Sequence, residues 1–387
     1  MKLSVATNMC SLTGYSELGR NIVLGLDKLG TDISLKILDE NMLQSSESML
    51  PADILDLIRR CKTKKLPEKI PVLTIGAPPQ YDVRMNIFKI AVGMFEAFSL
   101  PPAWLQLMNT MNLILTPSTF NQQVFIRQGL SKDKIAVIPP AVDAERFKDA
   151  EPFYIDAVRP FTILFLSQLI LRKGWDKLLK AVLRTFRIND DVTLILKLPP
   201  PNSEAQAIGM IERLKAVKQE AGPSKVHVYY NHYPIPIEQV PKVYAALKKK
   251  LPGKIYSHLN GSEPRGVFCL PSLGEGIGLG YLEAMASGVL TIGTNVTGSS
   301  FLNPNNSIVI KTGPPVRNLQ LELESTLYRN SPFPQVDIIA ISKALSRAYN
   351  MKDEERNKIT GNALEDVKGY TYEKCCVQIL TEIQARI

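Results

Sequence analysis

One stretch in the second half of the chain constrains the fold more than any other. It runs from Cys269 to Gly288 and reads CLPSLGEGIGLGYLEAMASG. The apolar residues 266–270 predict a buried strand, Pro271 and four closely spaced glycines end it, and a helical pattern returns at about Tyr281. A strand, a glycine turn and a helix N-terminus together present free backbone N–H groups and a positive dipole end. The stretch therefore indicates an α/β protein with an anion site in this turn.

Two glutamates accompany this turn. Glu275 lies in the turn and Glu283 in the first turns of the helix. Carboxylates beside an anion site do not bind the anion but accept hydrogen bonds from hydroxyl groups, so the combination favours a sugar nucleotide. A dinucleotide-binding G-x-G-x-x-G would need its third glycine at Leu279, Tyr281 or Glu283, and none of these is glycine. The alternative interpretation is a tight strand–helix turn with solvated glutamates.

Glu275 and Glu283 are separated by seven residues, and this spacing resembles the E-x7-E motif of glycosyltransferase family 4. The segment 289–295 also matches the next strand of that family. The resemblance implies an α/β chain with the GT-B fold, in which two Rossmann-like, doubly wound domains face a central cleft. It also implies a hexose-type transfer from a nucleotide-sugar, UDP-linked in our interpretation, with retention of anomeric configuration. The likeness covers nearly the whole chain and is more specific in the second domain.

The resemblance assigns roles to individual residues. Glu275 would hold sugar hydroxyls, Glu283 the ribose hydroxyls, and the backbone amides of residues 277–279 the phosphates. Gly14 falls on the first loop, whose glycine lets the backbone approach the donor phosphates. His232 lies in the region where the family holds the base. The expected nucleotide-sugar site is therefore Gly14, His232, Glu275, Gly276, Ile277, Gly278, Leu279 and Glu283.

The segment 167–174, SQLILRKG, resembles the basic turn with which the family neutralises the donor diphosphate. Fixed cations are most effective there because the leaving group gains charge in the transition state. Many members place the arginine five residues before the lysine, where this chain has Gln168. Lys173 is thus the firmer catalytic assignment and Arg172 the second. Glu96 lies in a stretch that resembles the acceptor side of the first domain, where it is either a polar contact or a structural residue.

The composition is that of an ordinary soluble globular protein. The 387-residue chain is 45% hydrophobic, and no leader segment or membrane-length apolar run is apparent. Five cysteines without framework spacing predict reduced thiols and a cytoplasmic protein. There is no D-x-D sequence and no zinc-ligand spacing, so we expect no metal and no cofactor beyond the donor substrate. His227 is expected to be buried, and His258 carries no assignment.

Strands alternate with helices along the chain, which predicts parallel sheets. We expect an acceptor-side domain at 1–150, a nucleotide-sugar domain at 151–371, and a final helix at 372–387 that crosses back, the last by resemblance. Expected first-domain strands are 2–7, 33–38, 72–76, 88–95, 113–116 and 135–138. Expected buried strands of the second domain are 161–166, 192–198, 226–230, 267–270 and 290–292, with a helix at 237–250. Beyond Ile310 the pattern predicts helices at 336–349, 353–368 and 372–387.

A net charge of +9 favours anionic partners. Two segments, 59–69 and 248–265, are unusually basic. They indicate either solvated loops or an electrostatic binding surface for a polyanion. The acceptor would then be DNA, an acidic glycan or a lipid at an anionic membrane surface. Two other functions remain open at this point: a GT-B sugar-nucleotide epimerase, and a nucleic-acid-binding module with an inert fold.

Overall fold

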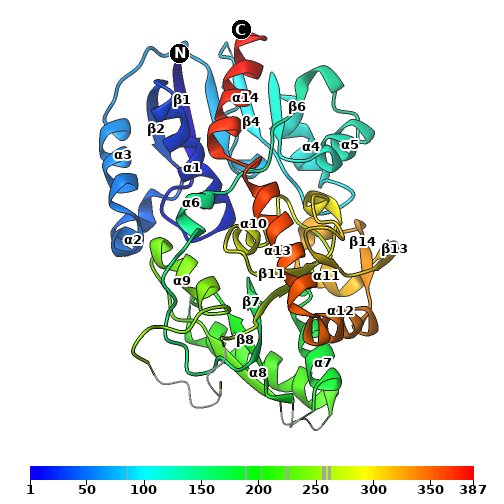
Figure 1. Cartoon of the computed structure of the whole chain (residues 1–387). Helices are drawn as coiled ribbons and strands as arrows, with labels where there is room; N and C mark the ends of the chain where they lie inside the picture. The colour runs from blue at the N-terminus through cyan, green and yellow to red at the C-terminus, as the bar shows by residue number, and fades with distance from the viewer. Residues whose placement is uncertain are drawn as a thin grey trace.

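A computed structural model describes residues 1–387 apart from 85, 188–189, 202, 223, 225, 255–258 and 260–262. Two six-stranded parallel sheets form the two halves of the molecule (Figure 1). The first sheet has the strand order β2-β1-β3-β4-β5-β6, and the second β12-β11-β10-β7-β8-β9. This confirms the predicted α/β class with two doubly wound sheets.

The first half contains the strands β1 (Lys2–Thr7), β2 (Asp32–Ile37), β3 (Val72–Ile75), β4 (Lys89–Val92), β5 (Leu113–Thr116) and β6 (Ile135–Val137). Its helices are α1 (Gly14–Lys28), α2 (Leu43–Ser46), α3 (Ala52–Lys62), α4 (Pro102–Asn109), α5 (Thr119–Arg127) and α6 (Ala144–Phe147). Leu3 and Val5 of β1 are fully buried, and Val5 is in register with Leu35 and Leu73 of the flanking strands. Inner strands buried in this way read as apolar runs, which is why the sequence predicted them.

The second half contains β7 (Phe161–Leu166), β8 (Val192–Lys197), β9 (His227–Asn231), β10 (Val267–Leu270), β11 (Leu290–Gly293) and β12 (Ile308–Val309). A two-stranded ribbon follows, β13 (Thr312–Arg317) and β14 (Pro332–Val336). The helices are α7 (Trp175–Thr185), α8 (Glu204–Ala221), α9 (Val240–Ala245), α10 (Leu279–Ala286), α11 (Leu319–Glu324), α12 (Ile338–Asn350), α13 (Asp353–Val367) and α14 (Tyr372–Gln384). Short 3-10 turns include η3 (Pro78–Gln80), η5 (Leu171–Lys173) and η9 (Thr297–Ser299).

The C-terminal helix α14 lies beside α1, at the same end of the molecule as the N-terminus (Figure 1). The Sγ atom of Cys376 on α14 lies 3.5 Å from the carbonyl oxygen of Ile22 on α1. Each of the five cysteines is buried and has a free thiol. Among the described residues, no helix combines the length and the apolar character needed to cross a bilayer.

Two expectations about the second half were wrong. The strand at 226–230 and its His227 were expected to be buried, but β9 is the edge strand of its sheet and His227, Tyr229 and Tyr230 are exposed. The helix α8, which precedes β9, buries only Leu214 among its described side chains, so it leaves that strand uncovered. Alternation of apolar residues therefore did not reflect burial at this edge.

The ribbon β13–β14 was missed altogether. It contains Pro314, Pro315, Pro332 and Pro334. Proline cannot donate to a strand ladder, so its presence argues against a central strand but remains compatible with an isolated edge ribbon. The helix expected at 237–250 is also shorter than predicted, because only α9 and a preceding 3-10 turn form there.

We predict that Gly25→Ala lowers the free energy of unfolding, because α1 packs closely against α14 at this position. A methyl group at Gly25 would lie 2.6 Å from the Sγ atom of Cys376, and overpacking of this kind costs about 1–3 kcal/mol. Adding Cys376→Ala should remove most of that cost in a double-mutant cycle measured by urea unfolding. Gly361→Ala in α13 is the matched control, because nothing lies within 4 Å of the added methyl group; it should stabilise by about 0.5–1 kcal/mol. Equal effects of the two glycine substitutions would contradict a tight α1–α14 contact.

Candidate functional site

The glycine turn between β10 and α10 lies where the two halves of the molecule meet. Gly278 caps α10 in a left-handed conformation, with φ of 83°. The turn is braced by η9: the Glu275 amide donates to Thr297 Oγ1 at 2.7 Å, and the Gly298 amide donates to the Glu275 carbonyl oxygen at 2.9 Å. The amides of residues 277–279 donate no hydrogen bond to any described group. This arrangement leaves three N–H groups without a protein acceptor among the described residues, and their role as an anion site stays a prediction.

Lys173 and Glu275 face each other across this turn. The Lys173 Nζ atom lies 2.7 Å from Oε1 and 2.8 Å from Oε2 of Glu275. Both side chains are largely buried. Burial alone would raise the pKa of Glu275, but the charges of Lys173 and Arg172 outweigh it and hold that pKa below its usual value. Burial lowers the pKa of Lys173, and the charge of Glu275 opposes that shift. The site therefore holds a closely paired carboxylate and amine that are shielded from water.

Arg172 is buried, and its guanidinium connects three parts of the chain. Its Nε atom donates to the Tyr328 hydroxyl at 2.9 Å, and Nη1 donates to the Gly274 carbonyl oxygen. Nη2 lies 3.1 Å from a carboxylate oxygen of Glu96, which belongs to the first half. Arg172 Nη1 is also 3.9 Å from Glu275. Arg172, which was expected to bind the diphosphate, therefore uses its N–H groups in contacts within the protein. One of its partners is Glu96, the residue expected on the acceptor side.

Further contacts join the two halves beside Arg172, and we call this set of contacts the Arg172 seam. A side chain at Gly274 would collide with the carbonyl oxygen of Glu96, so only glycine permits the approach. The Ser99 amide donates to Ser331 Oγ at 3.1 Å, which joins the β4–α4 connection to the residue before β14. Tyr328 and Ser331 both come from the ribbon region that the sequence did not reveal. No local pattern distinguished them, since their role depends on contacts with distant segments.

Glu283 lies in a separate buried cluster. It accepts a hydrogen bond from the Tyr244 hydroxyl at 2.9 Å. Burial, reinforced by the charge of Glu17, raises the pKa of Glu283 to about 7, although Arg146 acts in the opposite direction. Arg146 itself contacts Glu17 at 2.6 Å. The two glutamates of the E-x7-E spacing therefore face different surroundings, and Tyr244, Glu17 and Arg146 are neighbours of Glu283 that the sequence did not predict.

The first loop approaches the same region. A methyl group at Gly14 would lie 3.7 Å from Leu279 at the start of α10, so the two predicted donor-contacting segments are adjacent. The loop is held by Asp39, whose carboxylate accepts from the amides of residues 9–11 at 2.8–3.1 Å. Asp39 was also missed, although a carboxylate directly after a strand is a signal that a loop is fixed there.

His232 follows the edge strand β9 and is stacked between two tyrosines. Its ring lies 6.4 Å from that of Tyr230 and 5.3 Å from that of Tyr233, measured between centroids. Tyr233 is 69% exposed. The predicted base contact is thus part of an exposed aromatic row and not of the Lys173–Glu275 cluster.

The basic segment 59–69 is largely neutralised. Its ion pairs are Arg59–Glu47, Arg60–Asp27, Arg60–Asp56, Lys62–Glu40 and Lys64–Asp32. The other segment, 248–265, lies partly outside the described residues, as does His258. Of its described members, Arg265 pairs with Asp353 at 3.0 Å. Within the described chain, no group of three or more His, Cys, Asp or Glu is placed to hold a metal ion.

Comparisons with known proteins bear on the segment around the glycine turn and on the fold. Residues 264–319, which include the glycine turn and both glutamates, match the family model described as glycosyl transferases group 1. Over its full length the chain superposes on Anabaena HepE in complex with UDP and glucose, with a TM-score of 0.67 and 12% identity, covering 100% of both chains. The fold is GT-B. Sucrose-phosphate synthase of Thermosynechococcus elongatus gives a TM-score of 0.65 at 13% identity and covers 100% of this chain and 98% of its own.

A relative by sequence is one component of the phosphatidylinositol N-acetylglucosaminyltransferase from Arabidopsis thaliana. It is 26% identical over 201 residues, which are 51% of this chain and 37% of that protein. The chain therefore matches little more than a third of the length of that relative. The family match is confined to the segment around the glycine turn, and the superpositions show the GT-B fold.

We predict that Glu283 makes stability depend on pH. Its pKa of about 7 in the folded protein exceeds the usual 4.5, so the folded state binds more protons than the unfolded state between these values. Stability should then fall as pH rises from about 5 to 8, by up to about 3 kcal/mol. Glu283→Gln keeps an acceptor for Tyr244 and should remove most of this dependence in urea unfolding at pH 5 and pH 8. A parallel pH dependence in the variant and the wild type would contradict the assignment.

We predict that Tyr328→Phe loosens the Arg172 seam. The substitution leaves the buried Arg172 Nε atom without its acceptor, and an unsatisfied buried donor costs about 1–3 kcal/mol. The loss would be measured as a change in the free energy of unfolding. Tyr233→Phe, at an exposed tyrosine, should change stability by less than about 0.5 kcal/mol. Equal values would show that the Arg172–Tyr328 contact contributes little.

Proposed function

We propose that the chain is a retaining, metal-independent glycosyltransferase that moves a hexose-type sugar from a UDP-sugar. The observation that carries the proposal is the arrangement around the glycine turn. Three free amides at residues 277–279, the Lys173 ammonium and the Glu275 carboxylate converge there, at the carboxyl end of β10. In parallel sheets, ligands bind at the carboxyl ends of the strands. Donors for a diphosphate and an acceptor for sugar hydroxyls are thus supplied by one short segment and its neighbour.

In the proposed reaction, the acceptor hydroxyl oxygen attacks the anomeric carbon from the face on which the diphosphate departs. The bond between that carbon and the phosphate oxygen breaks, and the proton passes from the acceptor to a phosphate oxygen. No protein base is needed for this step. Lys173 and the amides of residues 277–279 would stabilise the charge that develops on the leaving group. Glu275 would accept hydrogen bonds from the sugar and hold it in position.

The remaining residues take supporting roles in this proposal. Glu283 would accept hydrogen bonds from the ribose, Gly14 would let the first loop approach the phosphates, and His232 would contribute to the base site. Arg172 would act by its charge and by holding the turn, because its donors already contact the protein. Glu96 would influence the acceptor side through its pair with Arg172.

The acceptor is proposed to be anionic, but the basic segment 59–69 supports this less than the sequence suggested. Most of its cations are paired with carboxylates, and exposed pairs of this kind are screened by salt. An acidic glycan, DNA or a membrane-surface lipid would have to find positive charge elsewhere on the chain.

A thermal-shift screen of sugar nucleotides tests the donor proposal. A ligand at 100 times its dissociation constant stabilises the folded state by about 2.7 kcal/mol. The two alternatives give different outcomes. A GT-B epimerase would convert the sugar without an acceptor and leave the nucleotide attached. An inert nucleic-acid-binding module would show salt-sensitive binding to DNA and no shift with any nucleotide.

We predict that Glu275→Gln lowers transfer about tenfold to a hundredfold. A hydrogen bond to a charged group contributes about 1.5–3 kcal/mol, and the amide is a weaker acceptor for sugar hydroxyls. The rate would be followed as UDP release in the presence of acceptor. Glu283→Gln should mainly weaken nucleotide binding. Glu220→Gln is the control, because Glu220 is exposed and pairs with Lys180 at 2.6 Å, and its loss should not affect turnover. Normal turnover in both the Glu275 and Glu283 variants would refute the site assignment.

A further inference from the structure

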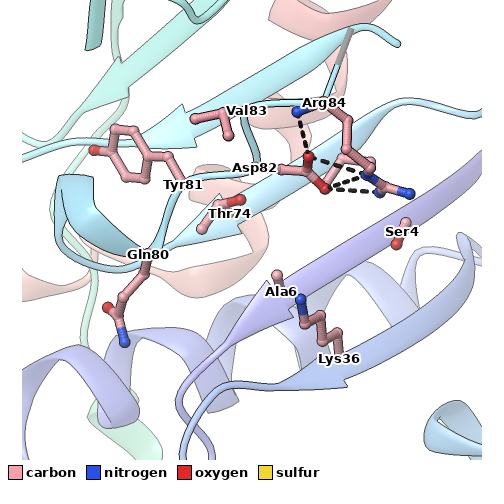
Figure 2. A pocket seen from close by; sticks show the side chains of 10 residues that line it. Ser4, Ala6, Lys36, Thr74, Gln80, Tyr81, Asp82, Val83 and Arg84 are labelled. Carbon is pink, nitrogen blue, oxygen red and sulfur yellow. Dashed lines mark hydrogen bonds and ion pairs between the residues drawn. The ribbon is translucent and has the colours of Figure 1, made fainter. Parts of the chain in front are cut away.

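The first sheet has a hollow that is separate from the glycine turn. The connection from β3 to β4 contains the 3-10 turn η3 and no longer helix among its described residues. Parallel strands are usually joined by a helix that covers one face of the sheet. Here a pocket of about 430 Å³ lies over β1, β2 and β3 and under this connection (Figure 2). Its volume falls within the range of about 300–1,000 Å³ typical of small-molecule sites.

The strand residues that line the pocket include Ser4 and Ala6 of β1 and Thr74 of β3, which are small or carry hydroxyls. The apolar Val72 of β3 and Lys36 of β2 line it as well. In β1, the neighbours Leu3 and Val5 belong to the apolar core. The Ser4 and Thr74 hydroxyls have no hydrogen-bond partner among the described residues. An inner strand that turned both faces to the core would carry apolar side chains on both, so this face suits a polar occupant.

The pocket also carries a positive charge that forms no ion pair among the described residues, although it helps to lower the pKa of Asp82. Lys36 of β2 lines it, is exposed, and forms no ion pair or hydrogen bond with any described residue. Arg84 and Asp82 form a pair at 2.7 Å on the opposite side (Figure 2). The hydrogen bonds from Arg84 hold the pKa of Asp82 below its usual value, so this carboxylate remains an acceptor for hydroxyls. Lys36 differs in this respect from most cations of the segment 59–69.

The position of the pocket links it to the first loop. Ala6, Lys36 and Thr74 each lie one residue before the carboxyl end of their strand, which is the edge where parallel sheets bind ligands. Gln80 lines the pocket, and its side chain amide donates to Asn8 at 3.4 Å. Asn8 directly follows β1 and leads into the loop that ends where α1 begins, at Gly14. An occupant of the pocket would therefore contact the connection that borders the donor loop.

We propose that this pocket is a second ligand site that binds a small phosphate-bearing polyol, such as a sugar phosphate. Lys36 provides a charge-assisted contact to the phosphate, and Ser4, Thr74 and Asp82 provide donors and acceptors for the hydroxyls. This pocket is separate from the proposed donor site. Its ligand is either the acceptor of the transfer or an effector, and the same phosphate and hydroxyl contacts would bind it in either case.

The test is isothermal titration of the full chain with glucose 6-phosphate. We expect saturable binding at one site, with glucose alone and inorganic phosphate alone each at least tenfold weaker. Lys36→Gln should weaken binding about tenfold or more. Lys2→Gln removes another exposed lysine of the same sheet that does not line the pocket, and it should leave affinity unchanged. Ala6→Leu fills the hollow and should abolish binding, while circular dichroism and the unfolding midpoint report whether each variant is folded.

Three outcomes would overturn the proposal: no saturable binding by the wild type, equal losses in Lys36→Gln and Lys2→Gln, or wild-type affinity in a folded Ala6→Leu variant. Incubation with a UDP-sugar distinguishes the two sources of ligand. Glucose 6-phosphate that becomes glycosylated is an acceptor, and glucose 6-phosphate that is recovered unchanged but alters UDP release is an effector. A thermal shift with UDP is measured in parallel, so a failure of the donor site and a failure of this pocket are told apart.

Discussion

The buried guanidinium of Arg172 is the interaction on which the arrangement of the two halves depends. Taking such a charge out of water costs several kcal/mol unless its donors are satisfied. Glu96, the Tyr328 hydroxyl and the Gly274 carbonyl oxygen satisfy them. These three partners come from the first half, the ribbon region and the glycine turn. One side chain thus couples the position of the turn to that of both neighbouring structures.

The glycine turn acquires its shape from close backbone approaches that larger residues would prevent. A side chain at Gly274 would collide with Glu96, and one at Gly298 would collide with the carbonyl oxygen of Gly276. Because the backbones come this close, the Glu275 amide and carbonyl group bond to η9 and the amides of residues 277–279 are left free. The free amides are a consequence of packing between distant segments, although the glycines that permit it are adjacent in sequence.

Charge compensation distinguishes the possible ligand sites from the rest of the surface. The net charge of +9 suggests a basic protein, yet most cations of the segment 59–69 already have carboxylate partners. Lys173 is paired with Glu275 at the glycine turn, where a donor phosphate would compete for the ammonium group. Among the described residues, Lys36 has no carboxylate within ion-pair distance and lies beside hydroxyls that have no hydrogen-bond partner. Pairing, more than the number of lysines, therefore decides where an anion would find positive charge.

The sequence by itself determined the α/β class and the strand–turn–helix unit at 266–288. These follow from local rules: strand and helix periodicity and the conformational freedom of glycine. The roles expected for Glu275 and Lys173 came instead from the resemblance to a family and stay predictions. The tertiary structure alone decided that Arg172 bonds to Glu96 and Tyr328, that Glu283 lies near Glu17 and Arg146, and that β9 is an exposed edge. Burial, pKa shifts and ion pairs depend on which segments meet in space, and the Arg172–Tyr328 contact joins residues 156 positions apart. A local pattern contains no information about such partners.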